Sequence, residues 1–329
     1  MEKTQVAAEA AIGETGRLRI AKKKVLPALI KVGISAGLIY WILQGTDLRE
    51  VFAAAGSANT WLLVLAFSLH IGGLTLSAYR WRLLLHTRGT DVSILFLIES
   101  YLVGVFFNNF LPSTVGGDAY RAYDSWRLGQ SRSGAVAVVF IDRFLGLLVL
   151  MLFALLALLV SNQLMGNVPY LHLWVLSGTA GMLAATWLMF APPRGLPEVI
   201  GRIQFPFRNK IRSIMDAFLA FKGQREVLFK ALGISVLLQA NVVIHYYLIA
   251  RSLSLPIPFY SFFLIIPLTT VITLLPISVN GIGVRENAYV FFFTPFAVLK
   301  PEAVAFAWIA YGMVVVQGVM GGLIYGLRK

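Results

Sequence analysis

The stretch "NNFLPSTVGGDAYR", residues 108–121, decides the fold of this chain. It follows an apolar segment that resembles a membrane span, yet it contains Pro112, two adjacent glycines, Asp118 and Arg121. Proline ends a helix by removing an N–H donor, and glycine permits the positive φ of a sharp turn. At membrane depth, a break of this kind is tolerated only where the backbone is buried in protein or lines a wet cavity.

The composition indicates an integral membrane protein. Of the 329 residues, 58% are hydrophobic and 13% are charged, with a mean hydropathy of +0.77, whereas soluble domains are about half apolar and a quarter charged. The chain has no cysteine and four histidines, so we expect no disulfide, no cysteine catalysis and no metal site. The glycine-spaced stretch 129–135 has Ala where a phosphate-binding loop needs Lys, so we also expect no nucleotide cofactor.

Apolar runs of about 20 residues predict the membrane spans. Six runs are predicted to cross fully: residues 25–43, 60–79, 133–160, 170–191, 227–250 and 303–327. Two further runs, residues 91–111 and 256–276, lead directly into Pro/Gly breaks. Within the last span, Gly318, Gly322 and Gly326 form a stripe that predicts close helix packing.

Basic residues set the predicted orientation. The tail of residues 1–24 and the connection 192–226 are rich in Lys and Arg, so both are expected in the cytoplasm, together with both chain ends. This arrangement requires residues 91–132 to form a re-entrant hairpin from the cytoplasm, and residues 256–299 to form one from the opposite side. The predicted fold is therefore all-α, with six full spans and two re-entrant hairpins in one membrane domain, residues 25–329. Eight full spans is the alternative.

The second break repeats the first. It lies in "LLPISVNGIGVRE", residues 274–286, and is again preceded by an apolar segment and followed by a long span. The residues with matching spacing are Pro112, Gly117 and Arg121 in the first break and Pro276, Gly281 and Arg285 in the second. Residues 60–160 and 227–327 are therefore predicted to form an inverted repeat, in which such interrupted segments indicate the binding site.

Charged residues at the breaks predict an anion site. A charge in the bilayer costs about 2.5–3.5 kcal/mol on insertion scales, so it is expected to pair or to function. A helix that restarts at about Gly117 or Gly283 directs unpaired N–H groups into the cavity, and phosphate is the expected ligand. Arg121 and Arg285 are the predicted phosphate ligands, with Arg143 as a third candidate. Among the carboxylates, Asp118 and Glu286 are expected near these arginines, while Glu99 and Asp142 are interpreted first as ion-pair partners and alternatively as proton or headgroup contacts.

Other polar residues in the spans receive a simpler interpretation. His70 and His245, like Gln239 and Asn241, are expected to form hydrogen bonds between helices rather than to bind a ligand.

Three stretches together resemble the lysylphosphatidylglycerol synthase transmembrane-region family, which includes the flippase half of the multiple peptide resistance factor. They are "NNFLPSTVGGDAYRAY", "GAVAVVFIDRFLGLLVL" and "LPISVNGIGVRENAYVFFF", and the resemblance covers about residues 25–327. It implies a multi-pass inner-membrane protein that handles lipids. The residues carried over as a candidate binding site are Asn108, Asn109, Asp118, Arg121, Asp142, Arg143, Asn280, Arg285 and Glu286, and those carried over as hairpin breaks are Pro112, Gly116, Gly117, Pro276, Gly281 and Gly283.

The leading hypothesis for the function is a lipid flippase or transporter. It would bind the phosphate-containing headgroup of a membrane lipid at the bilayer midplane, between the two hairpins, and we expect neither enzymatic activity nor a nucleic-acid partner. Synthase members of the family carry a soluble domain after the membrane region, and this chain ends at Lys329, so we do not expect it to make lysylphosphatidylglycerol. The alternatives are a membrane-embedded glycosyl- or phosphotransferase acting on a lipid carrier, with Asp142 or Glu286 as base, and a non-transporting partner subunit of a separate synthase.

Overall fold

The structure is a computed structural model that describes residues 32–44, 46–110, 116–160, 168–190, 221, 223–275 and 277–328, with the backbone alone at residues 110, 189 and 190. Its α-helices are α2 (Leu48–Gly56), α3 (Thr60–His86), α4 (Ile94–Phe110), α5 (Gly116–Arg127), α6 (Arg132–Leu158), α8 (Leu171–Phe190), α11 (Arg225–Ser252), α12 (Phe262–Leu274), α13 (Val284–Phe293) and α14 (Lys300–Leu327). A shorter apolar helix, Val32–Leu43, precedes α2. Two 3-10 turns, η1 (Phe259–Ser261) and η2 (Thr294–Phe296), flank α12 and α13.

Several predicted features lie outside the described residues. They are Pro112, Pro276, the tail of residues 1–24, the start of the first predicted span and residues 192–220 of the basic connection. The glycines that follow each proline are described, so each break can be followed from its C-terminal side.

Among the described residues, five helices are long and apolar enough to cross a membrane: α3, α6, α8, α11 and α14. Two of them begin at polar caps: Asn59 Oδ1 accepts from the N–H of Leu62 at 3.2 Å, and Ser131 Oγ accepts from that of Gly134 at 3.1 Å. These caps satisfy N–H groups that have no partner within the helix. The prediction of an all-α integral membrane protein is confirmed.

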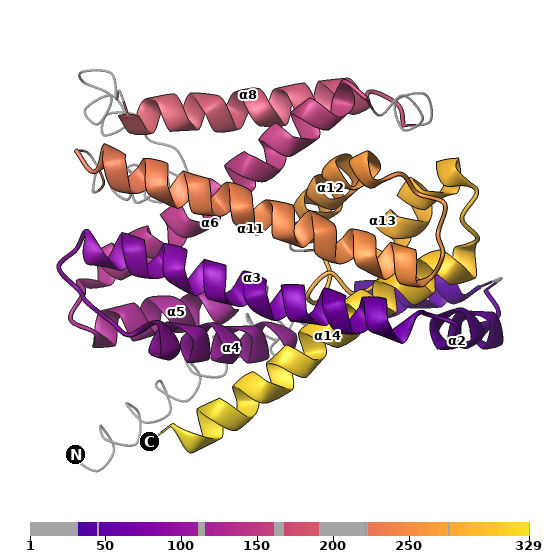
Figure 1. Cartoon of the computed structure of the whole chain (residues 1–329), viewed down its shortest axis with the longest axis horizontal. Helices are drawn as coiled ribbons and strands as arrows, with labels where there is room; N and C mark the ends of the chain where they lie inside the picture. The colour runs from indigo at the N-terminus through magenta and orange to yellow at the C-terminus, as the bar shows by residue number, and fades with distance from the viewer. Residues whose placement is uncertain are drawn as a thin grey trace, which may run out of the picture.

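Helix α6 lies at the centre of the bundle. It packs against α5, α11 and α12, and α8 packs on it at the edge of the view in Figure 1. α3 and α11 lie side by side, and α14 packs on α4 (Figure 1). Because α6 is largely buried by its neighbours, Asp142 lies inside the helix bundle, whereas the next residue, Arg143, is exposed.

Helices α4 and α5 pack tightly as a pair around the first break. A side chain on Gly117 would collide with the carbonyl oxygen of Gly104, so the two helices approach at the backbone. After α5, Gln130 Nε2 donates to the carbonyl oxygen of Arg88 at 3.2 Å, which lies just before α4. The α4–α5 pair therefore begins and ends near the same end of α3, its C-terminal end.

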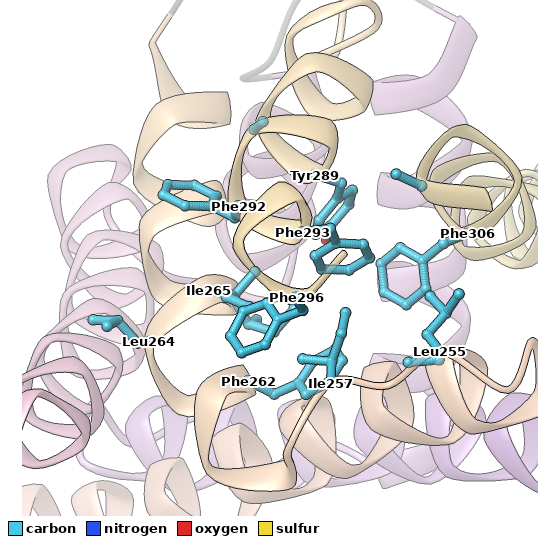
Figure 2. Packing of buried hydrophobic residues seen from close by; sticks show 14 of the residues in the cluster. Leu255, Ile257, Phe262, Leu264, Ile265, Tyr289, Phe292, Phe293, Phe296 and Phe306 are labelled. Carbon is cyan, nitrogen blue, oxygen red and sulfur yellow. The ribbon is translucent and has the colours of Figure 1, made fainter. Parts of the chain in front are cut away.

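Helices α12 and α13 form the corresponding pair around the second break. Leu255 and Ile257, which precede α12, share one buried cluster with Phe296, which follows α13 (Figure 2). The N–H of Asn59 donates to the carbonyl oxygen of Ser252 at 2.8 Å, which places the start of α3 beside this region. The α12–α13 pair thus begins and ends near the N-terminal end of α3, and the α4–α5 pair near its C-terminal end.

An aromatic core holds α13 in place. The rings of Tyr289 and Phe306 meet edge to face with centroids 4.8 Å apart, and Phe293 packs on Phe306 at 4.9 Å (Figure 2). Such pairs contribute about 0.5–1.5 kcal/mol each beyond their buried area. The helix that begins at the second break is therefore fixed against α14 along its inner face.

Candidate functional site

A cavity of about 340 Å³ lies between α3, α4, α5, α6, α11 and α12. Its polar lining includes Ser77, Arg80, Tyr101, Asn108, Asp118, Arg121, Asp142, Arg143, Gln239 and Thr270. Every one of these six helices contributes at least one polar residue. Five charged residues from α3, α5 and α6 therefore line one cavity within the apolar bundle.

Asp142 is the centre of this polar lining. Its Oδ1 accepts from Arg80 Nε at 2.7 Å, and its Oδ2 accepts from Arg121 Nη2 at 2.8 Å. Tyr101 adds a hydroxyl donor to Oδ2 at 2.9 Å, and Arg80 Nη1 donates to Ser235 Oγ at 2.8 Å. Asp142 is only 1% exposed, so this carboxylate is held in a dry site by two guanidinium groups.

Arg121 is fixed between two aromatic rings. Its guanidinium carbon lies 4.0 Å from the ring centroid of Tyr101 and 4.5 Å from that of Trp81. Cation–π contacts of this kind, away from water, are worth about 2 kcal/mol. Its Nε is buried and has no hydrogen-bond partner among the described residues. The side chain is thus rigid and retains one unused donor.

Asp118 and Arg143 extend the charge network toward a more accessible edge. Arg143 Nε lies 2.8 Å from Asp118 Oδ2, and Asp118 Oδ1 lies 3.7 Å from Arg121 Nη1. The Arg143 side chain is 42% exposed, against 4% for Arg121. The network therefore alternates between positive and negative side chains, in the order Arg80, Asp142, Arg121, Asp118 and Arg143. Three arginines against two aspartates leave it with an excess of one positive charge.

The first break delivers the start of α5 to this cavity. α5 begins at Gly116, one residue before the predicted restart. Asn108 Oδ1 accepts from the N–H of Gly117 at 2.7 Å, and thereby satisfies one of the free donors at the helix start. Since Asn108 and Gly117 both line the cavity, the broken helix and the charge network belong to the same site.

The second break is built on backbone that favours glycine. Gly281 and Gly283 have φ of 76° and 82°, and Asn280 has φ of 49°. α13 begins at Val284, and the N–H of Gly283 donates to Glu286 Oε2 at 2.7 Å. The structure thus uses Glu286 to cap its own helix. This contact differs from the predicted one with Arg285.

Arg285 and two asparagines form a separate polar group at the second break. Asn280 Nδ2 donates to Asn109 Oδ1 at 2.9 Å, and Arg285 Nη2 donates to the carbonyl oxygen of Asn280 at 3.1 Å. The Arg285 guanidinium lies 4.6 Å from the ring centroid of Tyr311, and its Nη1 is buried with no partner in the described part of the chain. None of these residues is among those that line the cavity. The adjacent Asn108 and Asn109 connect the two groups.

The chain matches a known protein family. Residues 28–320 match the family described as the lysylphosphatidylglycerol synthase TM region. The chain belongs to this family. The match includes both breaks and the Asp142 network, so the predicted resemblance is confirmed.

Relatives of this member of the lysylphosphatidylglycerol synthase TM region family are also membrane proteins. A UPF0104 membrane protein of Pyrococcus horikoshii is 22% identical over 310 residues, which cover 86% of this chain and 90% of that protein. One of Methanothermobacter thermautotrophicus is 24% identical over 299 residues, covering 85% and 88%. One of Methanocaldococcus jannaschii is 28% identical over 136 residues, covering 41% and 40%. The chain is a multi-pass membrane protein.

Two residues that bind Asp142, Arg80 and Tyr101, were missed in the sequence. The second predicted span, residues 60–79, ends just before Arg80, so the sequence places this arginine outside the span. The structure extends α3 to His86, so Arg80 lies within the helix and is 5% exposed. The signal that could have revealed it is the continued helical pattern beyond the charge. Tyr101 gave no comparable signal, since a tyrosine near a span is usually an interfacial residue.

Glu99 was predicted first as an ion-pair partner, and the structure places it beside the C-terminal end of α14. Arg328 Nη2 lies 3.0 Å from Glu99 Oε2, and Arg328 Nη1 lies 3.1 Å from Asp124 Oδ2. These contacts tie the last helix to α4 and α5 outside the cavity.

Replacing Tyr101 with Phe is expected to lower the free energy of unfolding by about 1.5–3 kcal/mol, because Asp142 loses a donor in a buried, charged hydrogen bond. Thermal unfolding of the purified protein in detergent measures the effect. Tyr79→Phe is the matched control, because Tyr79 is 49% exposed. Equal melting temperatures for the two variants would show that the Tyr101 hydroxyl is not held as described.

Proposed function

We propose that this protein binds the phosphate-containing headgroup of a membrane lipid in the cavity and moves that lipid between leaflets. The observation that carries the proposal is the network from Arg80 to Arg143, with its excess of one positive charge at an accessible edge. Membership in a family named for a lipid synthase supports a lipid-related role.

The charge balance favours a phosphate ligand. A phosphodiester carries one negative charge and would neutralise the excess positive charge of the network. Guanidinium groups bind phosphate oxygens in pairs with good geometry. Arg143 is held by Asp118 at the exposed edge. A phosphate displaces Asp118 from Arg143 and takes its place as the partner of this arginine. Asp142 stays bound to Arg80 and keeps the inner part of the site in place.

The two broken helix pairs provide a path for the lipid. We propose that α4–α5 and α12–α13 are re-entrant, that they enter from opposite faces, and that residues 60–160 and 227–327 form an inverted repeat. Both chain ends then lie in the cytoplasm, with the protein in the inner membrane. As the units rock about the cavity, Arg285 supplies the second phosphate contact through its unpartnered Nη1.

Lipid movement in reconstituted vesicles tests this proposal. Vesicles of phosphatidylcholine would carry a trace of fluorescent phosphatidylglycerol, and a membrane-impermeant quencher would report its appearance in the outer leaflet. Arg143→Ala and Arg285→Ala are each expected to slow movement about tenfold or more, because each removes a charge-assisted contact worth about 1.5–3 kcal/mol.

Arg82→Ala is the matched control. Arg82 pairs with Asp91 on the surface at 3.1 Å and does not line the cavity. Its variant is expected to move lipid at the wild-type rate. If the Arg143 and Arg285 variants move lipid as fast as the wild type, the proposed function is wrong.

A further inference from the structure

Two histidines meet where α3, α11 and α14 converge, outside the cavity. The rings of His70 and His245 stack with centroids 4.8 Å apart and an interplanar angle of 23°. His245 is 2% exposed, and Gln317 of α14, which is 3% exposed, lies beside His70. His70 itself is half-buried. Histidines inside a membrane bundle are unusual and often mark proton pathways.

The hydrogen bonds around the pair allow one ring nitrogen to be protonated. His245 Nδ1 lies 2.8 Å from the carbonyl oxygen of Ala66, so Nδ1 is the donor of a neutral ring. His70 Nε2 and Gln317 Nε2 are both buried without a hydrogen-bond partner in the described structure. An amide can turn over, so Gln317 offers an N–H to a neutral His70 and its oxygen to a protonated one. The arrangement therefore accommodates both protonation states of His70.

The groups that face the pair carry no opposing charge. α11 contributes Tyr246, whose ring lies 5.0 Å from His245, and α14 contributes the uncharged Gln317. α13 contributes Tyr289 behind Tyr246, with the two rings 6.2 Å apart. In the described residues no carboxylate pairs with either histidine. A proton on the pair therefore adds an uncompensated charge to the contact between helices.

We propose that the His70–His245 pair binds the single proton that couples lipid movement to a proton gradient. The inference rests on the proposed function and names its energy source. One positive charge is accommodated, because two charged rings stacked at this distance would repel each other. The uncompensated charge changes the packing of α3, which belongs to one proposed unit, on α11 and α14, which belong to the other.

The steady-state distribution of lipid across vesicles tests the coupling. With the membrane potential clamped, a pH difference of one unit should drive fluorescent phosphatidylglycerol to an asymmetry of up to about tenfold for one proton per lipid. His245→Gln and His70→Gln are each expected to leave the lipid evenly distributed under the same gradient. His86→Gln is the matched control and is expected to retain the asymmetry, since His86 lies at the end of α3, away from the pair.

Proton binding can be measured without transport. With ¹³C-labelled histidine, NMR of the full protein in nanodiscs should show one proton taken up by the coupled pair over the pH range in which the gradient drives lipid. If the pair stays neutral throughout, the inference is overturned, whatever the fate of the proposed function. If lipid moves but its distribution ignores the gradient, or either glutamine variant retains the asymmetry, the coupling is wrong and the flippase proposal stands. If the wild type moves no lipid, the proposed function and the coupling built on it both fail. A pair that still takes up a proton would then be a proton-binding site without a role in transport.

Discussion

Replacing Asp142 with Asn is expected to lower the free energy of unfolding by about 3–5 kcal/mol. The change removes the negative charge that Arg80 and Arg121 share. It leaves buried Arg80 without an opposite charge, and Arg121 with only the longer contact to Asp118. Breaking a buried ion pair from one side carries a cost of this size, because the partner charge keeps its desolvation penalty. Thermal unfolding in detergent, together with the yield of folded protein, measures the loss.

A second substitution separates charge from packing. Adding Arg80→Met to the Asp142→Asn variant removes one of the stranded charges, so the double variant is expected to be more stable than the single one. Asp91→Asn is the surface control and is expected to unfold like the wild type, since Asp91 pairs with Arg82 in solvent. If the double variant is less stable than Asp142→Asn alone, the buried charges are not what the substitution disturbs.

The membrane class and the positions of the breaks were predictable from the sequence. Composition fixes the class, because so apolar a chain has no other way to bury its surface. Glycine and proline mark helix ends by their backbone chemistry alone, so α5 begins within one residue of Gly117, and α13 within one residue of Gly283. These signals are local and need no knowledge of distant neighbours.

The partners of the buried charges were not predictable. The cost of a charge in the bilayer says that Asp142 must pair, but not with which residue. Its two charged partners come from α3 and α5, 62 and 21 residues away in the chain. Asn109 and Asn280 meet across 171 residues in the same way. Such pairs depend on how each helix is rotated about its axis, which the alternation of apolar and polar residues does not determine in a helix surrounded by lipid and protein.

Replacing Gly321 with Ala is expected to destabilise the protein by about 3 kcal/mol. A Cβ at this position would overlap the carbonyl oxygen of Leu102, a backbone atom of α4 that cannot turn away. Overpacking of a tight contact usually costs about 1–3 kcal/mol, and contact with backbone puts this case at the upper end. The predicted stripe of Gly318, Gly322 and Gly326 did not include this residue, although the closest approach of α14 to α4 occurs there.

Gly312→Ala in the same helix is the matched control. Nothing lies within 4 Å of a Cβ added there, and the residue is exposed on the bundle surface. Its replacement is expected to stabilise α14 by up to about 1 kcal/mol, because alanine favours a helix over glycine. Opposite signs for Gly321→Ala and Gly312→Ala in thermal unfolding would locate the α4–α14 contact. A Gly321→Ala protein as stable as Gly312→Ala would show that α14 does not approach α4 at the backbone, and the position of the last helix would have to be revised.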